Sequence, residues 1–179
     1  MKKIEIKGKQ VEIIENLSET KINKFELILL NYYNEFDNEI DRFVNVLSLA
    51  SNLSIDEVEE LDLDLFKDLV TSLNINDLDE LQELPTTDFV FDGITYNRVK
   101  NINEVKLTVK EMRLLQNAIS LNKNKFVGIL ASIIYIPTGE NLTEESISKR
   151  KEILENNMSM GYIIPFLIKV KDLNGLQPK

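Results

Sequence analysis

The chain of 179 residues is 43% hydrophobic and 28% charged, and its formal net charge is −9. These values are typical of a globular protein, and the length suits one well-buried domain or a compact domain with a smaller appendage. The chain contains no cysteine and no histidine, which excludes disulfide bonds, thiolate zinc sites, cysteine nucleophiles and the commonest general base.

The negative charge is concentrated in the first half of the chain. Residues 10–87 carry 19 acidic and 4 basic side chains, a net charge of −15, whereas residues 1–9 and residues 88–179 each carry a net charge of +3. This charge argues against nucleic-acid binding by the first half. Two interpretations stay open: a solvated, solubilising face, or an acidic surface that meets a basic partner or the basic half of a second copy.

The first element in chain order is a predicted β-hairpin. Residues 2–14 alternate apolar and charged side chains around Gly8, and this pattern is typical of a hairpin. The same stretch is too polar and too regular for a signal peptide, and no apolar run long enough to cross a membrane follows. We therefore expect a cytosolic protein without a membrane segment.

Apolar residues at helical spacing then predict five short helices, over residues 19–35, 38–50, 54–61, 62–73 and 76–84. Asn38 is the expected N-cap of the second helix, and Ser54 with Glu57 forms a capping box for the third. The residues expected on the inward faces are Ile22, Phe25, Leu29, Tyr32, Phe36, Ile40, Phe43, Val44, Leu47, Ala50, Leu63, Phe66, Leu69, Val70 and Leu73.

Seven acidic residues of the third and fourth predicted helices form the candidate partner-binding face: Asp56, Glu57, Glu59, Glu60, Asp62, Asp64 and Asp68. Asp62 and Asp64 have the spacing that opens a calcium loop. Phe66 and Lys67 then stand where that loop needs a third ligand and a glycine. We therefore expect no metal here, and interpret the acids as solvated groups that complement helix dipoles. The partner-binding role of this face is a hypothesis.

Pro85 to Thr87 is the predicted seam of the chain. It separates residues 1–84, a hairpin plus an acidic helical region, from residues 88–179, unless the two halves form one compact domain. After the seam, alternation around Asp92-Gly93 predicts a second β-hairpin over residues 88–99.

Residues 100–106 follow as a short third strand or an extended linker. Thr108 with Glu111 makes another capping box, which opens a predicted helix to residue 121. The residues expected on its inward face are Val109, Met112, Leu115, Ala118 and Ile119.

The most apolar stretch of the chain, residues 125–136, predicts a buried central helix that ends before Pro137. About 20 residues are needed to span a bilayer, so this shorter helix is expected in a protein core. Gly128, Ala131 and Ser132 share one face of it. Because these residues are small, we expect a neighbouring element to approach closely there.

Thr143 is the expected cap of a charged helix over residues 144–156, which we predict to lie on the outside. Its basic run, Lys149 to Lys151, is interpreted as a solvated face rather than a phosphate site. A last helix opens near Ser159, with Pro165 bending it or standing in its first turns. Together the elements predict an α+β, predominantly α-helical fold: two small β-hairpins with a helical bundle around one buried central helix.

Motifs of known chemistry are absent from the sequence. It has no glycine-rich phosphate loop, no HExxH and no serine elbow. Paired carboxylates such as Glu59-Glu60 and Glu144-Glu145 look exposed, and we expect no carboxylate in an apolar setting that would raise its pKa. The tyrosines are expected in the core or an interface rather than stacked on bases: Tyr32, Tyr33, Tyr96, Tyr135 and Tyr162. We predict no enzyme, no catalytic residue and no cofactor.

The second half carries a recurring pattern: a strand pair, a Leu-Thr helix start at Leu107-Thr108, a helix ending in proline over residues 129–137, an arginine-containing helix at Arg150, and a closing hydrophobic helix over residues 158–168. From Phe89 onward this order resembles small structural or tail-assembly proteins of tailed bacteriophages. Where their closing helix has two phenylalanines, this chain has Pro165-Phe166. The resemblance implies no catalytic residues.

We therefore expect a non-enzymatic protein of protein–protein assembly, in particular a bacteriophage virion or tail-assembly component, located in the host cytoplasm or incorporated in the virion. Its partners would be further copies of itself or other virion proteins, bound through the acidic half and the hairpin edges. The alternative is a small acidic adaptor or inhibitor of a host or phage protein, in one form a nucleic-acid mimic. Membranes and nucleic acids are not expected as partners.

Overall fold

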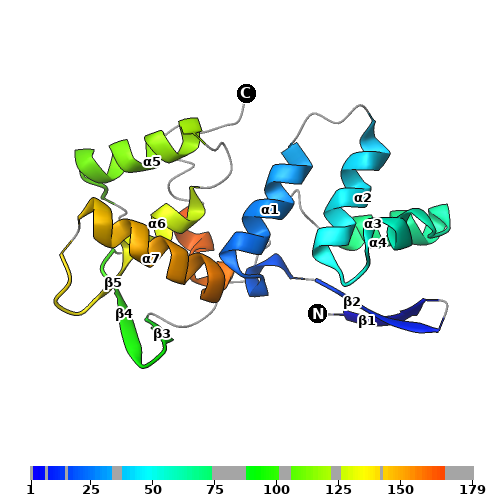
Figure 1. Cartoon of the computed structure of the whole chain (residues 1–179), viewed down its shortest axis with the longest axis horizontal. Coiled ribbons are helices and arrows are strands. Elements are labelled where there is room, and N and C mark those ends of the chain that lie inside the picture. Colours follow the sequence, from blue (N-terminus) through cyan, green and yellow to red (C-terminus); the bar gives the residue numbers. More distant parts are fainter. Residues whose placement is uncertain are drawn as a thin grey trace.

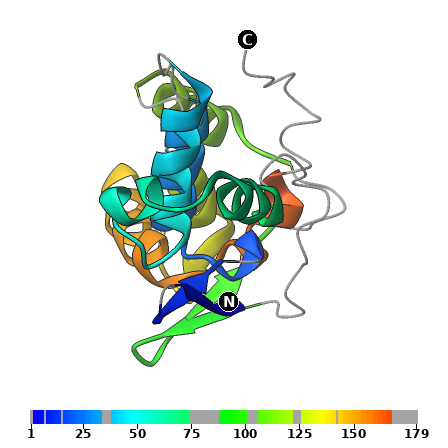
Figure 2. The same cartoon turned by 90° about the vertical axis from the view of Figure 1, so that its right-hand side faces the viewer.

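The computed structural model describes residues 2–6, 8–14, 16–33, 38–73, 88–100, 106–121, 126–141 and 143–167. In these residues the fold is α+β and predominantly α-helical, with two small antiparallel sheets (Figure 1). Both hairpins lie on the lower side of the molecule in Figure 1 and Figure 2, with β1–β2 at the right and the second hairpin at the left of Figure 1. The predicted fold class is confirmed.

The N-terminal hairpin consists of β1 (Lys2–Ile6) and β2 (Lys9–Ile13), paired antiparallel as predicted. Gly8 lies in the turn with a φ of 81°, which is a left-handed conformation that glycine adopts without strain. The backbone N–H of Ile14 donates to the carbonyl of Ala50 at 2.9 Å. This bond ties the hairpin to the first helical region.

That region contains a 3₁₀ turn and four helices: η1 (Leu17–Glu19), α1 (Ile22–Tyr33), α2 (Glu39–Ala50), α3 (Ile55–Glu59) and α4 (Leu63–Ser72). The predicted caps are confirmed. Asn38 accepts a hydrogen bond from the Asp41 N–H, and Ser54 and Glu57 form a reciprocal capping box. These side chains satisfy N–H groups that lack partners within their helices.

Three residues predicted on inward faces are exposed instead. Ile40 is 59% exposed, Leu63 is 57% exposed, and Val109 is 73% exposed. Each stands in the first turn of its helix. The helical period identifies a face of a helix, but not where along the helix its covering neighbour ends.

The second sheet has the strand order β3–β4–β5, with β3 (Phe89–Phe91) and β4 (Ile94–Arg98) forming the predicted hairpin. Its turn residues, Asp92 and Gly93, have φ values of 49° and 72°, as a tight hairpin turn requires.

The third strand of this sheet was wrongly predicted as part of the central helix. It is β5 (Tyr135–Pro137), with Arg98 opposite Tyr135 and Tyr96 opposite Pro137. Pro137 disfavours helical angles at the residue before it, and β4 offers that extended backbone a partner. Of residues 100–106, predicted as a third strand or a linker, 101–105 lie outside the described residues, and 100 and 106 are in no strand.

The second helical region contains α5 (Val109–Leu121), α6 (Val127–Ile134) and α7 (Glu144–Asn157). The capping box predicted at Thr108 and Glu111 is present, with bonds of 2.6 and 3.2 Å. Helix α6 is buried along nearly its whole length, and α1, α5 and α7 pack around it (Figure 1). The predicted central helix is therefore confirmed, though it is shorter.

After α7 the chain returns to the start of α1. The N–H of Ile22 donates to the carbonyl of Met158 at 3.1 Å, and the N–H of Met160 donates to the carbonyl of Thr20 at 2.8 Å. A 3₁₀ turn, η3 (Met160–Tyr162), follows. Pro165 is then the second residue of a short helical stretch, where its missing N–H has no partner to lose.

Buried residues of both halves belong to one continuous cluster, which includes Phe25 and Val44 as well as Leu130 and Phe166. The predicted seam at residues 85–87 and the helix over 76–84 lie outside the described residues. Among the helices that the structure describes, none combines the length and apolar character needed to cross a membrane.

Candidate functional site

The candidate acidic face is carried by α3, α4 and the turn between them. Six of its seven residues are exposed, and Glu57 is half-buried. The structure thus brings these side chains onto neighbouring short elements, as the sequence spacing indicated.

Two of the seven residues support the local fold. Asp62 is the N-cap of α4, and its carboxylate accepts a hydrogen bond from the Leu65 N–H at 2.9 Å. Glu57 closes the capping box with Ser54 and also forms an ion pair with Lys9 of β2. The hydrogen bond from Lys9 and that from the Ser54 backbone lower the pKa of Glu57. These two residues are therefore poor positions for testing partner binding.

Apolar side chains are exposed on the same helices as these acids. Ile55 is 45% exposed at the start of α3, and Leu63 is 57% exposed at the start of α4. A mixed acidic and apolar surface suits a protein partner better than an ion. Within the described residues, no group of three or more acidic side chains is arranged to hold a metal.

A second exposed apolar surface lies on the β3–β4 hairpin. Val90 is 63% exposed, Ile94 is 46% exposed, and Phe91 is 37% exposed. Val90 lies opposite Thr95, whereas Phe91 lies opposite Ile94 beside the turn, so apolar groups reach both faces of the hairpin. Among the strands that the structure describes, β3 is also an outer strand of its sheet.

The base of this hairpin is fixed by aromatic packing. The ring of Phe89 lies 5.9 Å from that of Tyr96 and 5.5 Å from that of Tyr162. Tyr162 in turn lies 6.0 Å from Tyr135, whose hydroxyl donates to the Tyr162 carbonyl at 3.1 Å. Burial raises the pKa of Tyr135. Tyr96 and Tyr135 are buried and Tyr32 and Tyr162 half-buried, so the expected packing role holds for them; the side chain of Tyr33 is outside the described part.

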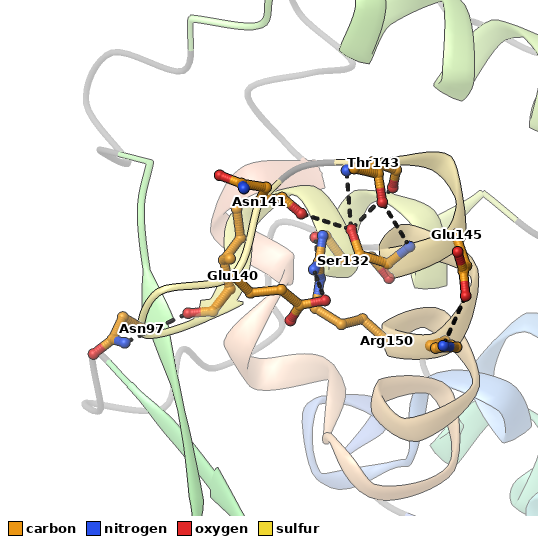
Figure 3. A network of polar contacts seen from close by, with 10 residues as sticks. Asn97, Ser132, Glu140, Asn141, Thr143, Glu145 and Arg150 are labelled. Atoms are coloured by element: carbon orange, nitrogen blue, oxygen red, sulfur yellow. Dashed lines mark hydrogen bonds and ion pairs between the residues drawn. The ribbon is translucent and has the colours of Figure 1, made fainter.

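Helix α7 differs from the predicted solvated helix. Arg150 is only 2% exposed; its Nε donates to the Ser132 carbonyl at 3.1 Å, and its Nη1 lies 2.8 Å from Glu140 Oε1 (Figure 3). Arg150 stands between Ile147 and Leu154 on the buried side of α7. That spacing was the sequence signal for its burial. The basic run is therefore neither a fully solvated face nor an exposed phosphate site.

The loop before α7 presents Glu140 to Arg150 (Figure 3). Asn97 of β4 donates from its side-chain amide to Thr138 Oγ1 at 2.8 Å. At the other end of the loop, Thr143 and Ser146 form a capping box, and the Ser146 hydroxyl donates to the Asn141 carbonyl at 2.8 Å. The loop is thus held at both ends.

Glu26 of α1 contradicts the expectation that no carboxylate lies in an apolar setting. It is 2% exposed, and its Oε1 accepts from the N–H groups of Val127 at 2.8 Å and Gly128 at 3.4 Å. Burial, reinforced by the Glu155 carboxylate, raises the pKa of Glu26 from 4.5 to about 7. The sequence signal was its position four residues after Ile22, on the inward face.

Glu155 of α7 reaches the same point from the other side. A Cβ atom on Gly128 would overlap the Glu155 carboxyl group, so only glycine lets that group lie so close to α6. The predicted close approach at Gly128 is therefore confirmed. The ammonium of Lys151 lies 2.7 Å from Glu155 Oε1. Two carboxyl groups, one from α1 and one from α7, thus meet at the N-terminus of α6.

Comparison with known proteins identifies no family for the chain. No protein-family model matches it, and no curated protein or solved structure is significantly similar to it.

Proposed function

We propose that this protein is a non-enzymatic assembly component that binds protein partners through the β3–β4 hairpin. The exposed apolar surface of that hairpin, formed by Val90, Phe91 and Ile94, carries the proposal. Its virion or tail-assembly context, in the host cytoplasm or the particle, rests on the resemblance of the second half to tailed-phage proteins.

The contrast between the base and the tip of the hairpin supports a docking role. Phe89 and Tyr96 anchor the base in the core, so the tip is presented on a fixed support. Exposed apolar residues on an outer strand invite pairing with another chain. A hairpin without a partner would gain nothing from three exposed apolar residues so close together.

A second copy of the chain is the partner to test first. Two β3 strands can pair antiparallel about a two-fold axis, because the edge of a strand is complementary to itself in that arrangement. Such pairing would join two three-stranded sheets. Depending on which face of the hairpin meets the partner, it would cover Val90, or Phe91 and Ile94, in both copies.

The test is the absolute mass of the protein in solution, measured by light scattering at low salt and at about 1 M salt. We expect an oligomer that persists at high salt, because apolar contacts are not screened. The double variant Val90→Thr, Ile94→Thr keeps β-branched side chains but removes apolar surface, and it should be monomeric.

The matched control is Val109→Thr, which changes an exposed valine on α5 and should leave the oligomer intact. An oligomer of the same mass for the wild-type protein and the hairpin variant would contradict the proposal. A wild-type monomer at both salt concentrations would contradict self-assembly and favour the second candidate.

The second candidate is an acidic adaptor or inhibitor, favoured by the exposed apolar residues Ile55 and Leu63 on the acidic helices. A basic protein partner, including one that normally binds nucleic acid, would fit such a surface.

Charge reversal separates the two candidates. The double variant Asp64→Lys, Asp68→Lys spares the capping residues Asp62 and Glu57. Under the adaptor proposal it should abolish capture of a basic partner from infected cells while the far-ultraviolet circular dichroism stays unchanged. Under the assembly proposal it should leave the mass of the oligomer unchanged.

A further inference from the structure

The N-terminus of α6 is enclosed by three helices. Helix α6 contributes the N–H groups of Val127 and Gly128, α1 contributes Glu26, and α7 contributes Glu155 and Lys151. The side chain that precedes the helix, Phe126, makes no capping hydrogen bond. Glu26, which lies 101 residues before Val127 in the chain, takes that role.

We propose that Glu26 and Glu155 form a proton-binding site that couples the packing of α1 against α6 and α7 to pH. The site is independent of the proposed assembly function. It stands on the burial of Glu26, on its bonds to α6, and on the approach of Glu155 that Gly128 permits.

The charges around Glu26 explain why a proton is held there. The two N–H groups of α6 and the Lys151 ammonium favour the carboxylate. Loss of solvation and the neighbouring negative charge of Glu155 have the opposite effect, since both favour the protonated acid. Burial is the larger influence, so the pKa of Glu26 rises to about 7.

The sign of the effect on stability follows from linkage. The folded protein binds this proton below about pH 7, whereas the unfolded chain releases it near the ordinary value of 4.5. The contribution of Glu26 to the free energy of unfolding is therefore fully present below pH 4.5 and is lost as the pH rises to about 7. Glu57 and Glu145 have lowered pKa values. Their contribution to stability has the opposite dependence on pH, because it is lost as the pH falls into the acid range.

The direct test follows the isotope-labelled carboxyl carbons of glutamate by NMR in the full chain. We expect one glutamate with a midpoint of about 7, accompanied by shifts of the Val127 and Gly128 amides at the same pH. A protein in which every described glutamate titrates below about pH 5.5 would overturn the proposal. This measurement needs no variant.

The coupling is tested by urea denaturation between about pH 5 and pH 8. The midpoint of the wild-type protein should fall by about 1 M urea over this range, and Glu26→Gln should abolish the fall because its amide cannot ionise. Glu155→Gln should reduce the fall, since it removes the neighbouring charge. Glu59→Gln, at an exposed position on α3, is the matched control and should leave it unchanged. The same fall in wild type and Glu26→Gln would overturn the proposal.

Discussion

The two ends of α6 are capped in the same way but with different consequences. At the N-terminus, the Glu26 carboxyl group of α1 accepts from the first N–H groups; near the C-terminus, the Arg150 guanidinium of α7 donates to the Ser132 carbonyl. Each charge has the sign that the helix dipole favours at its end. A central helix that lacks a side-chain cap of its own is thus held by charges from its neighbours.

The difference lies in the second partner at each end. Arg150 has the opposite charge of Glu140 beside it, whereas Glu26 has the like charge of Glu155. Opposite charges stabilise each other's ionised forms, and like charges favour the binding of a proton. One end of α6 is therefore a fixed ionic contact, and the other responds to pH.

The largest expected effect comes from breaking the fixed end. Arg150→Met keeps the buried aliphatic volume, but it leaves the Ser132 carbonyl without its donor and Glu140 without its partner. We expect a loss of about 3 kcal/mol in the free energy of unfolding, measured by urea denaturation at neutral pH.

The matched control for that change is Lys149→Met, the preceding residue of α7. Lys149 pairs with Glu145, and both side chains are well exposed, at 73% and 79%. Solvent screens an ion pair this exposed, so its loss should change the free energy of unfolding far less than the loss of Arg150 does. Similar losses for the two variants would show that Arg150 does not hold the end of α6.

A smaller effect is expected from Gly128→Ala at the other end. The added methyl group displaces the Glu155 side chain, which is flexible, so the cost should be about 1–2 kcal/mol. In a Glu155→Ala background the same change should cost nothing, because alanine favours the helix. A double-mutant cycle of urea denaturation measures this, and an equal cost in both backgrounds would contradict the contact.

Local sequence signals predicted most of the secondary structure. The capping boxes at Ser54 and Thr108 and the turn at Asp92-Gly93 involve residues within three or four positions of one another, so their chemistry is readable from the sequence. Strand β5 was missed because an extended segment of three residues needs a partner strand, and β4 lies about 40 residues earlier along the chain.

The charged contacts at α6 were missed for the same reason. Glu26 and Arg150 were both expected to be solvated. Their positions beside inward-facing apolar residues could have indicated burial, but not which groups each side chain would contact. Their partners are the ends of a helix that belongs to another part of the chain. The exposed apolar tip of the hairpin was likewise not predicted. The alternation of Phe89 and Phe91 predicts a strand, but not which of its side chains another element covers.

The pairing of Thr20 and Ile22 with Met158 and Met160 also has a consequence for the order of folding. During synthesis, at about 5–20 residues per second, roughly 7 to 28 s pass between the appearance of these two segments. Throughout that interval α1 lacks the surfaces of α6 and α7 that pack against it in the folded protein. One side of α1 therefore stays uncovered in the nascent first half, although α2 can already pack against the helix. A chaperone or a second nascent chain can reach that side before the protein's own C-terminal part does.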